Sequence, residues 1–177
     1  MIKTISSSIK YKNRWMTVYE DIIERPSGAQ GIYGFVDKID FVAILAIQDG
    51  YIYLVEQYRY PIKSRSLEIP MGAWQSQPNV DPKLLALGEL KEETGYQAGS
   101  IEKIGFLHVS NDSSNEGCHV FFATDLTFVG TDLDPEEEDL ELIRLPLKDF
   151  EQKITEGNIR SSCTVACYGL AKLKNII

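Results

Sequence analysis

Three glutamates are spaced so that they could share a metal ion. They lie in the run Gly88-Glu89-Leu90-Lys91-Glu92-Glu93-Thr94-Gly95. Spacings of three and four residues place Glu89, Glu92 and Glu93 side by side on about one turn of a helix. Like charges at this spacing destabilise a helix by about 0.2–0.5 kcal/mol per pair, whereas clustered carboxylate oxygens bind hard divalent cations. The spacing alone therefore favours an acidic helix face in solvent, and the alternative is a metal site.

The residues around these glutamates predict the helix that carries them. Asp81 is a good N-cap, and Pro82 suits the first helical position. Gly95 is a natural left-handed terminator. Apolar and small residues at helical spacing predict a buried stripe on the face opposite the glutamates: Leu84, Leu87, Leu90 and Thr94, widened by Leu85 and Ala86.

Mostly strands are predicted on both sides of this helix. Segments 41–48 and 51–58 flank Asp49-Gly50, a strong hairpin signal, and their apolar composition predicts central strands covered on both faces. Further strands are expected at 15–23, 67–70, 101–109, 118–123 and 140–145, and helices at 147–156 and 162–173. Many strands with one mid-chain helix and a helical tail predict an α+β sandwich.

The composition excludes several functional classes. Eighteen Lys and Arg against 26 Asp and Glu give a net charge of -8 in 177 residues, which opposes binding to a nucleic acid polymer or an anionic membrane. The longest apolar run, 41–47, is too short to span a bilayer, and no long apolar stretch of a signal peptide follows Lys3. We therefore expect one cytoplasmic domain, residues 1–177, with a small-molecule partner.

The cysteines and histidines lack the spacing of common metal motifs. The chain has three cysteines and no CxxC pair, so we expect buried free thiols, with a metal or redox pair as the alternative. Cys163 and Cys167 are four residues apart in a predicted helix. His108 and His119 are expected to be strand residues, and the alternative is a role as ligands.

Two segments resemble the signature of the Nudix hydrolases. They are Leu67-Glu68-Ile69-Pro70-Met71-Gly72 and Gly88-Glu89-Leu90-Lys91-Glu92-Glu93-Thr94-Gly95-Tyr96, which are similar to the family's glycine loop and metal-binding helix. Upstream, Val55-Glu56-Gln57-Tyr58-Arg59-Tyr60-Pro61 is most similar to the ADP-ribose and nucleotide-sugar pyrophosphatase branch. The resemblance runs from about residue 41 to residue 173 and implies a Nudix-like α/β/α sandwich with a mixed β-sheet.

The resemblance also implies a set of metal ligands. Glu89 and Glu93 would bind the same Mg²⁺ or Mn²⁺ ion, and Glu92 would hold a second ion or brace the first. The carbonyl of Met71 would be another ligand, since the neighbouring Gly72 allows close backbone approach. Such ions neutralise pyrophosphate oxygens and lower the pKa of an attacking water.

Other residues are implied in substrate binding and catalysis. Arg59 would grip a phosphate, with a surface ion pair as the alternative, and Glu68 would lie near the metal ions. In the acidic loop 134–139, Glu136 is the first candidate for the general base and Glu138 the second, each also a possible metal ligand; the alternative is a solvated acidic turn. Glu116 matches another acidic position of the branch.

The N-terminal region, residues 1–40, is expected to be rich in β-structure. In similar proteins this region packs across a homodimer and completes the partner's site. Trp15 and Tyr33 are therefore candidates to stack on the base of the nucleotide, and core packing is the alternative for each.

The sequence departs from the family pattern at scaffold positions. Gly88 stands where the family has arginine, and Val80 stands where it has glutamate, after a loop that is two residues longer than usual. Asn111-Asp112 stand where ADP-ribose pyrophosphatases often have proline and glycine.

The expected function follows from the resemblance. It is metal-dependent hydrolysis of the pyrophosphate bond of ADP-ribose, or of a related nucleoside diphosphate sugar, to a nucleoside monophosphate and a sugar phosphate. One alternative is a nucleotide-binding sensor that has lost catalysis. The other is a Nudix enzyme that acts on a nucleoside triphosphate or a coenzyme.

Overall fold

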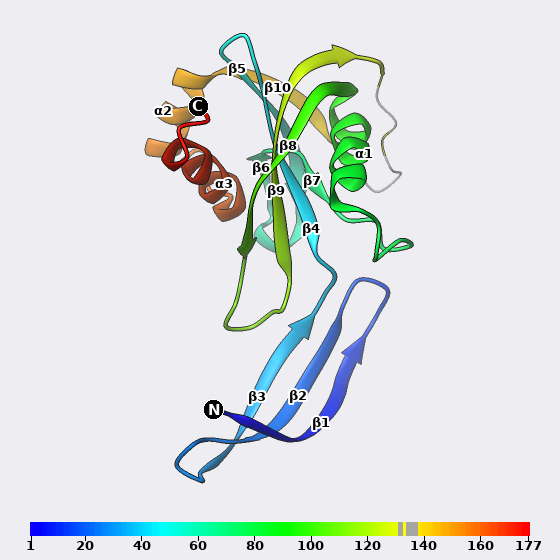
Figure 1. Cartoon of the computed structure of the whole chain (residues 1–177), viewed down its shortest axis with the longest axis vertical. Helices are drawn as coiled ribbons and strands as arrows, with labels where there is room; N and C mark the ends of the chain where they lie inside the picture. Colours follow the sequence, from blue (N-terminus) through cyan, green and yellow to red (C-terminus); the bar gives the residue numbers. More distant parts are fainter. Residues whose placement is uncertain (131–132, 134–137) are drawn as a thin grey trace.

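The first 37 residues form a three-stranded antiparallel sheet of their own. The computed structural model describes residues 1–130, 133 and 138–177, and within these ranges no helix is long and apolar enough to cross a membrane. The N-terminal sheet has the order β1-β2-β3, with strands β1 (Lys3–Lys12), β2 (Thr17–Glu24) and β3 (Gln30–Asp37). It projects from one end of a larger body (Figure 1). Every residue of β1 is exposed, including Ile5, Ile9 and Tyr11.

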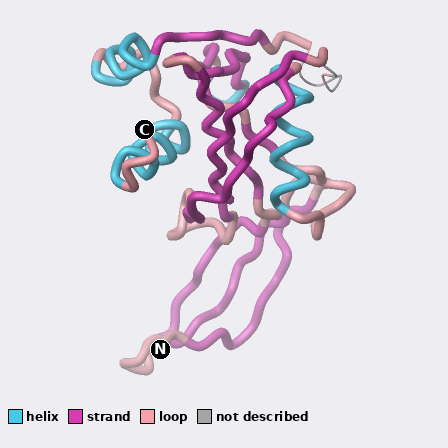
Figure 2. Tube along the Cα trace, turned by 45° about the horizontal axis from the view of Figure 1, so that its top comes forward, coloured by secondary structure: helices cyan, strands magenta, loops and turns pink. Residues whose placement is uncertain are grey.

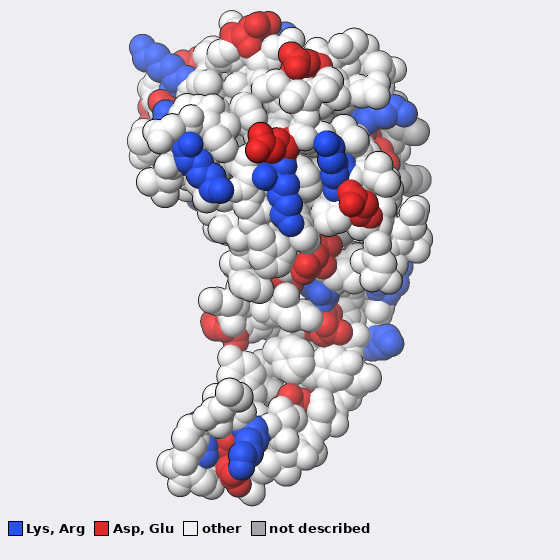
Figure 3. All heavy atoms as spheres, in the orientation of Figure 1, with Lys and Arg blue, Asp and Glu red and all other residues white. Residues whose placement is uncertain are grey.

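The N-terminal sheet contacts the body through one loop. Val36 N–H donates to the carbonyl of Ser113 (2.8 Å), and the hydroxyl of Tyr33 donates to the carbonyl of Asp112 (2.7 Å). Lys38 N–H donates to Oδ1 of Asn115. Figure 3 shows a concave flank between the sheet and the body, with Lys and Arg interspersed among Asp and Glu over the body. The face in this view therefore offers no broad basic surface for a polyanion.

A mixed sheet forms the centre of the body. Its order is β10-β5-β4-β9-β8, with β6 added to β5 and β7 added to β4. Only β4 and β9 pair in parallel among the described strands; the other pairs are antiparallel. The strands are β4 (Phe41–Gln48), β5 (Tyr51–Arg59), β6 (Ser64–Glu68), β7 (Met71–Gly72), β8 (Tyr96–His108), β9 (Gly117–Phe128) and β10 (Glu141–Pro146).

Helices cover both faces of this sheet. A short 3₁₀ turn, η1 (Tyr60–Ile62), follows β5, and the α-helices are α1 (Pro82–Thr94), α2 (Leu147–Thr155) and α3 (Ser162–Leu173). Helix α1 lies on one face, and α2 and α3 lie on the other (Figures 1 and 2). Leu90 packs with Ile44 in the core under α1, whereas Phe150 packs with Leu45 and Leu54 in the core on the opposite face. The predicted α+β sandwich with a mixed sheet is confirmed.

Local signals set several element boundaries as predicted. Asp81 Oδ1 accepts hydrogen bonds from the N–H groups of Lys83 (2.8 Å) and Leu84 (3.3 Å) at the start of α1. Gly95 ends the helix with a φ of 74°. Asp49 and Gly50 both adopt positive φ, 53° and 78°, in the tight turn between β4 and β5, as a two-residue hairpin of right-handed twist requires.

Strand bounds differ from the sequence expectation in several places: β6 covers residues 64–68 and not 67–70, and β3 was not expected by residue number. β8 and β9 extend well beyond the expected 101–109 and 118–123 because they pair with each other along almost their whole length. The strand β1 was not expected by residue number. Its apolar residues Ile5, Ile9 and Tyr11 alternate, but the run of serines at 6–8 between them weakens the strand signal.

Candidate active site

Two of the three helix glutamates are buried against the sheet, not exposed on an outer face. Glu89 is 6% exposed and Glu93 1%, and both lie on the side of α1 that contacts β7. Leu84, expected in the buried stripe, is 59% exposed instead. The prediction that the glutamates lie opposite the leucines was therefore wrong for Glu89 and Glu93. Leu85, Ala86 and Leu90 fill the core beside them.

The loop before α1 is fitted to these carboxylates. The N–H of Met71 donates to Glu93 Oε2 at 3.0 Å. A β-carbon at Gly72 would lie 2.2 Å from Glu89 Oε2 and 2.6 Å from its Cδ, so only glycine leaves room for the Glu89 carboxylate. The backbone at Met71-Gly72 and the two buried carboxylates thus occupy one small volume between β7 and α1.

This donor set fits a hard divalent cation. Moving charged carboxylates out of water costs several kcal/mol each unless other charges compensate, and two of them lie one helical turn apart here. Carboxylate and backbone carbonyl oxygens are the ligands that such cations take. Glu89, Glu93 and Glu92, with the carbonyl of Met71, are the residues that could hold the ion.

Glu92 has a partner that the sequence analysis missed. The indole Nε1 of Trp74 donates to Glu92 Oε2 at 3.2 Å. A β-carbon at Gly88 would lie 2.2 Å from Cζ2 of Trp74 and 2.6 Å from its Cη2, so the indole occupies the space beside Gly88. The signal was present in the sequence: the longer loop carries a tryptophan, and the helix has glycine where the family has arginine.

Arg59 and Glu68 form an ion pair next to this loop. Arg59 Nη2 lies 2.7 Å from Glu68 Oε2, and the Arg59 Nε also donates to Glu68. Glu68 is buried, whereas more than a third of the Arg59 side chain is exposed. The Arg59 side chain is therefore anchored to Glu68 and partly exposed, which suits a group that meets an incoming anion.

The two base candidates fall at the limit of the described chain. Glu136 lies outside the described residues, and Glu138 is exposed in a turn. The next residue, Asp139, is tied to the sheet: its carboxylate pairs with Arg65 at 3.1 Å and accepts a hydrogen bond from Tyr58 N–H at 2.9 Å. Glu138 is thus attached to a fixed point beside β5 and β6.

The remaining candidates lie toward the N-terminal sheet. Glu116, in the loop between β8 and β9, pairs with Lys38. Trp15 is 44% exposed in the turn after β1, with the guanidinium of Arg14 over its ring at 4.2 Å. Tyr33 is 41% exposed on β3. Neither aromatic residue packs into a core formed by the described residues, so the core-packing alternative was wrong for both.

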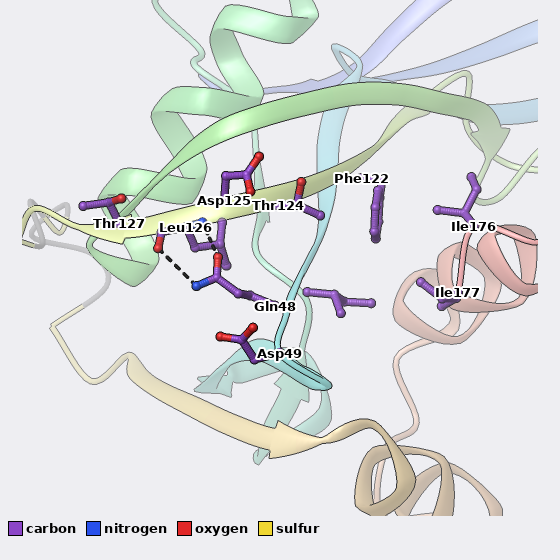
Figure 4. A pocket seen from close by; sticks show the side chains of 10 residues that line it. Gln48, Asp49, Phe122, Thr124, Asp125, Leu126, Thr127, Ile176 and Ile177 are labelled. Carbon is purple, nitrogen blue, oxygen red and sulfur yellow. Dashed lines mark hydrogen bonds between the residues drawn. The ribbon is translucent and has the colours of Figure 1, made fainter.

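Two hollows of the described structure do not include the helix glutamates. One, of about 660 Å³, lies at the end of β4 far from β7 and is lined by residues such as Gln48, Asp125 and Ile177 (Figure 4). The other, of about 590 Å³, lies between the N-terminal sheet and residues 111–115 and includes Tyr33. The carboxylates between β7 and α1 are the better site for chemistry, because oxygen donors converge there.

The histidines confirm the expectation that they are strand residues. His108 ends β8 and His119 lies in β9. His119 lies 3.4 Å from Asp40 and 2.8 Å from Lys103 Nζ. Burial, and then the Lys103 charge, lower the pKa of His119 below its ordinary value, and Asp40 opposes this shift.

Comparisons with known proteins agree with this geometry. Residues 2–36 match the family model of the nucleoside diphosphate sugar hydrolase N-terminal domain. The chain is 30% identical over 178 residues to an ADP-ribose pyrophosphatase of Bacillus subtilis (strain 168), covering 99% of this chain and 95% of that protein. It is 32% identical over 180 residues to a methanol dehydrogenase activator of Bacillus methanolicus, with the same coverage. The crystal structure of an ADP compounds hydrolase shares the fold, with a TM-score of 0.84 at 20% identity, over 97% of this chain and 92% of that one.

Proposed function

The chain belongs to the Nudix hydrolases, in their ADP-ribose and nucleotide-sugar pyrophosphatase branch, and from this premise we propose what it hydrolyses. The substrate is ADP-ribose or a related nucleoside diphosphate sugar, and the products are a nucleoside monophosphate and a sugar phosphate. The observation that carries the proposal is the burial of Glu89 and Glu93 together against Met71-Gly72. This arrangement brings carboxylate oxygens and the loop backbone together at one place, as a site for a divalent cation requires.

The divalent ion of the site is proposed to be Mg²⁺ or Mn²⁺. Glu89 and Glu93 hold it from adjacent turns of α1, Glu92 holds a second ion or braces the first, and the Met71 carbonyl adds a ligand. When bound, the ion supplies charge neutralisation of the pyrophosphate and a lower pKa for the attacking water. Because Gly72 has no side chain, the Glu89 carboxylate can lie against its backbone.

The protein's own side chains orient the substrate and accept the proton. Arg59, anchored by Glu68 and partly exposed, binds a phosphate oxygen with its guanidinium. Hydrolysis needs a base that takes one proton from water as the oxygen attacks phosphorus, and Glu136 or Glu138 is proposed for this role. Such a base contributes about 10²- to 10⁴-fold to the rate. Glu116 is proposed to contact the substrate from the β8–β9 loop.

The proposed active form is a homodimer located in the cytoplasm. The N-terminal sheet leaves Ile5, Ile9 and Ile32 exposed, and exposed apolar side chains on one sheet are typical of a protein–protein contact. Tyr33 on β3 and Trp15 in the turn between β1 and β2 are exposed as well, and are proposed to stack on the base of a nucleotide bound by the partner chain.

A panel of substrates tests the proposed reaction. Purified protein is incubated with Mg²⁺ and ADP-ribose, other nucleoside diphosphate sugars, nucleoside triphosphates and dinucleotide coenzymes, and the products are separated by chromatography. Release of a nucleoside monophosphate and a sugar phosphate supports the proposal, and Glu93→Gln should then lose most turnover while keeping its circular dichroism spectrum. Products from triphosphates or coenzymes alone would contradict the nucleotide-sugar substrate.

A catalytically impaired sensor is the second candidate function. Gly88 and Val80 replace an arginine and a glutamate of the family pattern, and Val80 packs against the apolar core under α1. Tight binding of a nucleotide sugar, measured by calorimetry, with no product in the same panel would favour the sensor. The direct hydrogen bond from Trp74 to Glu92 favours the enzyme, because it supplies a brace within the altered scaffold.

A further inference from the structure

The three cysteines of the chain converge on one point, on the face of the sheet opposite α1. Cys118 lies in β9, and Cys163 and Cys167 lie in the first and second turns of α3. The sulfur atoms of Cys118 and Cys163 are 3.7 Å apart, and those of Cys163 and Cys167 are 3.8 Å apart. All three lie within 4.8 Å of one another. These are all of the cysteines in the sequence, and they come together from segments 45 residues apart.

These separations match those of thiolates around one tetrahedral ion. At the Zn–S bond length of about 2.3 Å, two sulfurs at the tetrahedral angle are about 3.8 Å apart. Two of the three sulfur pairs already have this spacing. The sulfur atoms of the third pair, Cys118 and Cys167, lie within 4.8 Å of each other.

Cys163 is the member of the cluster best placed to meet an incoming ion. Cys118 and Cys167 are fully buried, whereas Cys163 is partly exposed, so the cluster is open on one side. Cys163 lies in the first turn of α3, next to the N-cap Ser161, where the helix dipole stabilises a negative charge.

We infer that Cys118, Cys163 and Cys167 form a binding site for a thiophilic divalent ion of the Zn²⁺ class, separate from the carboxylates of α1. Each thiol releases its proton to solvent as its sulfur bonds to the ion, and water fills the fourth position. Thiolates select Zn²⁺, whereas the oxygen donors of Glu89 and Glu93 select Mg²⁺ or Mn²⁺. The sequence favoured free thiols because it has no CxxC spacing; only the fold brings the third cysteine to the other two.

The site is linked to the loop of the candidate active site. Ile69 N–H donates to Thr164 Oγ1 at 3.1 Å. Thr164 follows Cys163 in α3, and Ile69 lies between Glu68 and Met71. An ion that fixes the first turn of α3 therefore also fixes the segment from Glu68 to Met71, which includes the ion-pair partner of Arg59. Binding of the ion should raise the melting temperature of the body.

A titration with Cd²⁺ tests the site in the full chain. Cd²⁺ bound by thiolates gives a charge-transfer absorption band in the near ultraviolet, which oxygen ligands do not give. The protein is kept reduced by a phosphine, and excess Mg²⁺ occupies the carboxylates. We expect a band that saturates at one Cd²⁺ per chain and is stronger at higher pH, since bound thiols lose protons. Native mass spectrometry should count one Zn²⁺ per chain.

Two variants separate the thiol site from the carboxylate site. Cys163→Ser, at the partly exposed position, should weaken Cd²⁺ binding by at least about 10-fold and remove the rise in melting temperature with Zn²⁺. Glu93→Gln should keep both the band and the rise. If Cys163→Ser does not fold, Cys163→Ala is measured in its place. The absence of a band in the wild type, or an unchanged band in the folded variant, would mean packed free thiols only and would overturn the inference.

Discussion

The indole ring of Trp74 lies directly against the backbone of Gly88, and its N–H donates to the carboxylate of Glu92 at 3.2 Å. The two residues are complementary: a β-carbon at position 88 would overlap the ring at 2.2 Å. Because position 88 is glycine and not the arginine of the family pattern, the Trp74 ring has room to lie there and to hold Glu92 from the loop. The contacts of the missing arginine are thus replaced by those of Trp74.

Replacing Gly88 by alanine should destabilise the protein. In an open helix this change stabilises by up to about 1 kcal/mol. The matched control is Gly169 in α3, where an added β-carbon would have no heavy atom within 4 Å. At Gly88 the overlap with Trp74 should reverse the sign, with a net loss of about 1–2 kcal/mol. Urea unfolding of Gly88→Ala and Gly169→Ala measures both, and equal stabilisation by the two variants would contradict the packing described.

Trp74→Phe should weaken the metal site while keeping most of the packing. The phenyl ring still fills the space at Gly88, but Glu92 loses its indole donor. Loss of a group that orients a metal-binding carboxylate typically costs about 10- to 100-fold in metal affinity, so the Mg²⁺ concentration for half-maximal activity should rise by at least about 10-fold.

A double-mutant cycle assigns this effect to the pair. If Trp74 acts through Glu92, then Trp74→Phe should have little further effect in a Glu92→Gln background. Fully additive effects of the two substitutions would show that the tryptophan acts by another route.

The stability of the protein should fall as the pH drops below about 6.5 because of His119. Burial and Lys103 lower its pKa in the folded state, so between the folded pKa and the ordinary value of 6.5 the unfolded chain binds more protons. The contribution of His119 to the free energy of unfolding is complete above pH 6.5 and is lost as the pH falls toward the folded-state pKa. Urea unfolding across this range should show a shallower pH dependence for His119→Gln than for the wild type. Parallel curves for the two proteins would exclude His119 as the source.

Removal of the N-terminal sheet should give a monomer that binds substrate less tightly. A chain starting at about residue 41 keeps the mixed sheet and its three helices but loses the exposed apolar residues of β1 and β3. Light scattering should report a monomer, and the KM should rise because Trp15 and Tyr33 no longer reach a partner's nucleotide. A truncated protein that stays dimeric with an unchanged KM would refute the proposed role of this sheet.

Much of the fold could be predicted from local signals. The Asp81-Pro82 start, the Gly95 end and the Asp49-Gly50 turn depend on the chemistry of one or two residues, and the structure has each where it was expected. The bounds of α2 and α3 also differ by at most one residue from the expected 147–156 and 162–173. Strand ends were less predictable, because the length of β8 and β9 depends on their pairing partner.

The predictions that were wrong concern contacts between segments that are distant in the sequence. Helical spacing grouped Glu89 and Glu93 correctly but put them on the solvent side, because the spacing does not reveal that β7 approaches that side of α1. Trp74 was missed because its role needs Gly88, 14 residues away in the chain. In the same way, Trp15 and Tyr33 are aromatic residues of the kind usually buried, yet both are exposed, because the N-terminal sheet projects from the body and does not pack into the core formed by its described residues.

Crystals soaked in Mn²⁺ test the central claim most directly. Anomalous diffraction locates manganese directly, and carboxylate oxygens bind small divalent cations at about 2 Å. We predict a strong peak between α1 and β7, bound by Glu89 and Glu93, that disappears in Glu93→Gln. A map with no peak there, while substrate is still hydrolysed, would show that these buried carboxylates do not hold the ion on which the proposed chemistry depends.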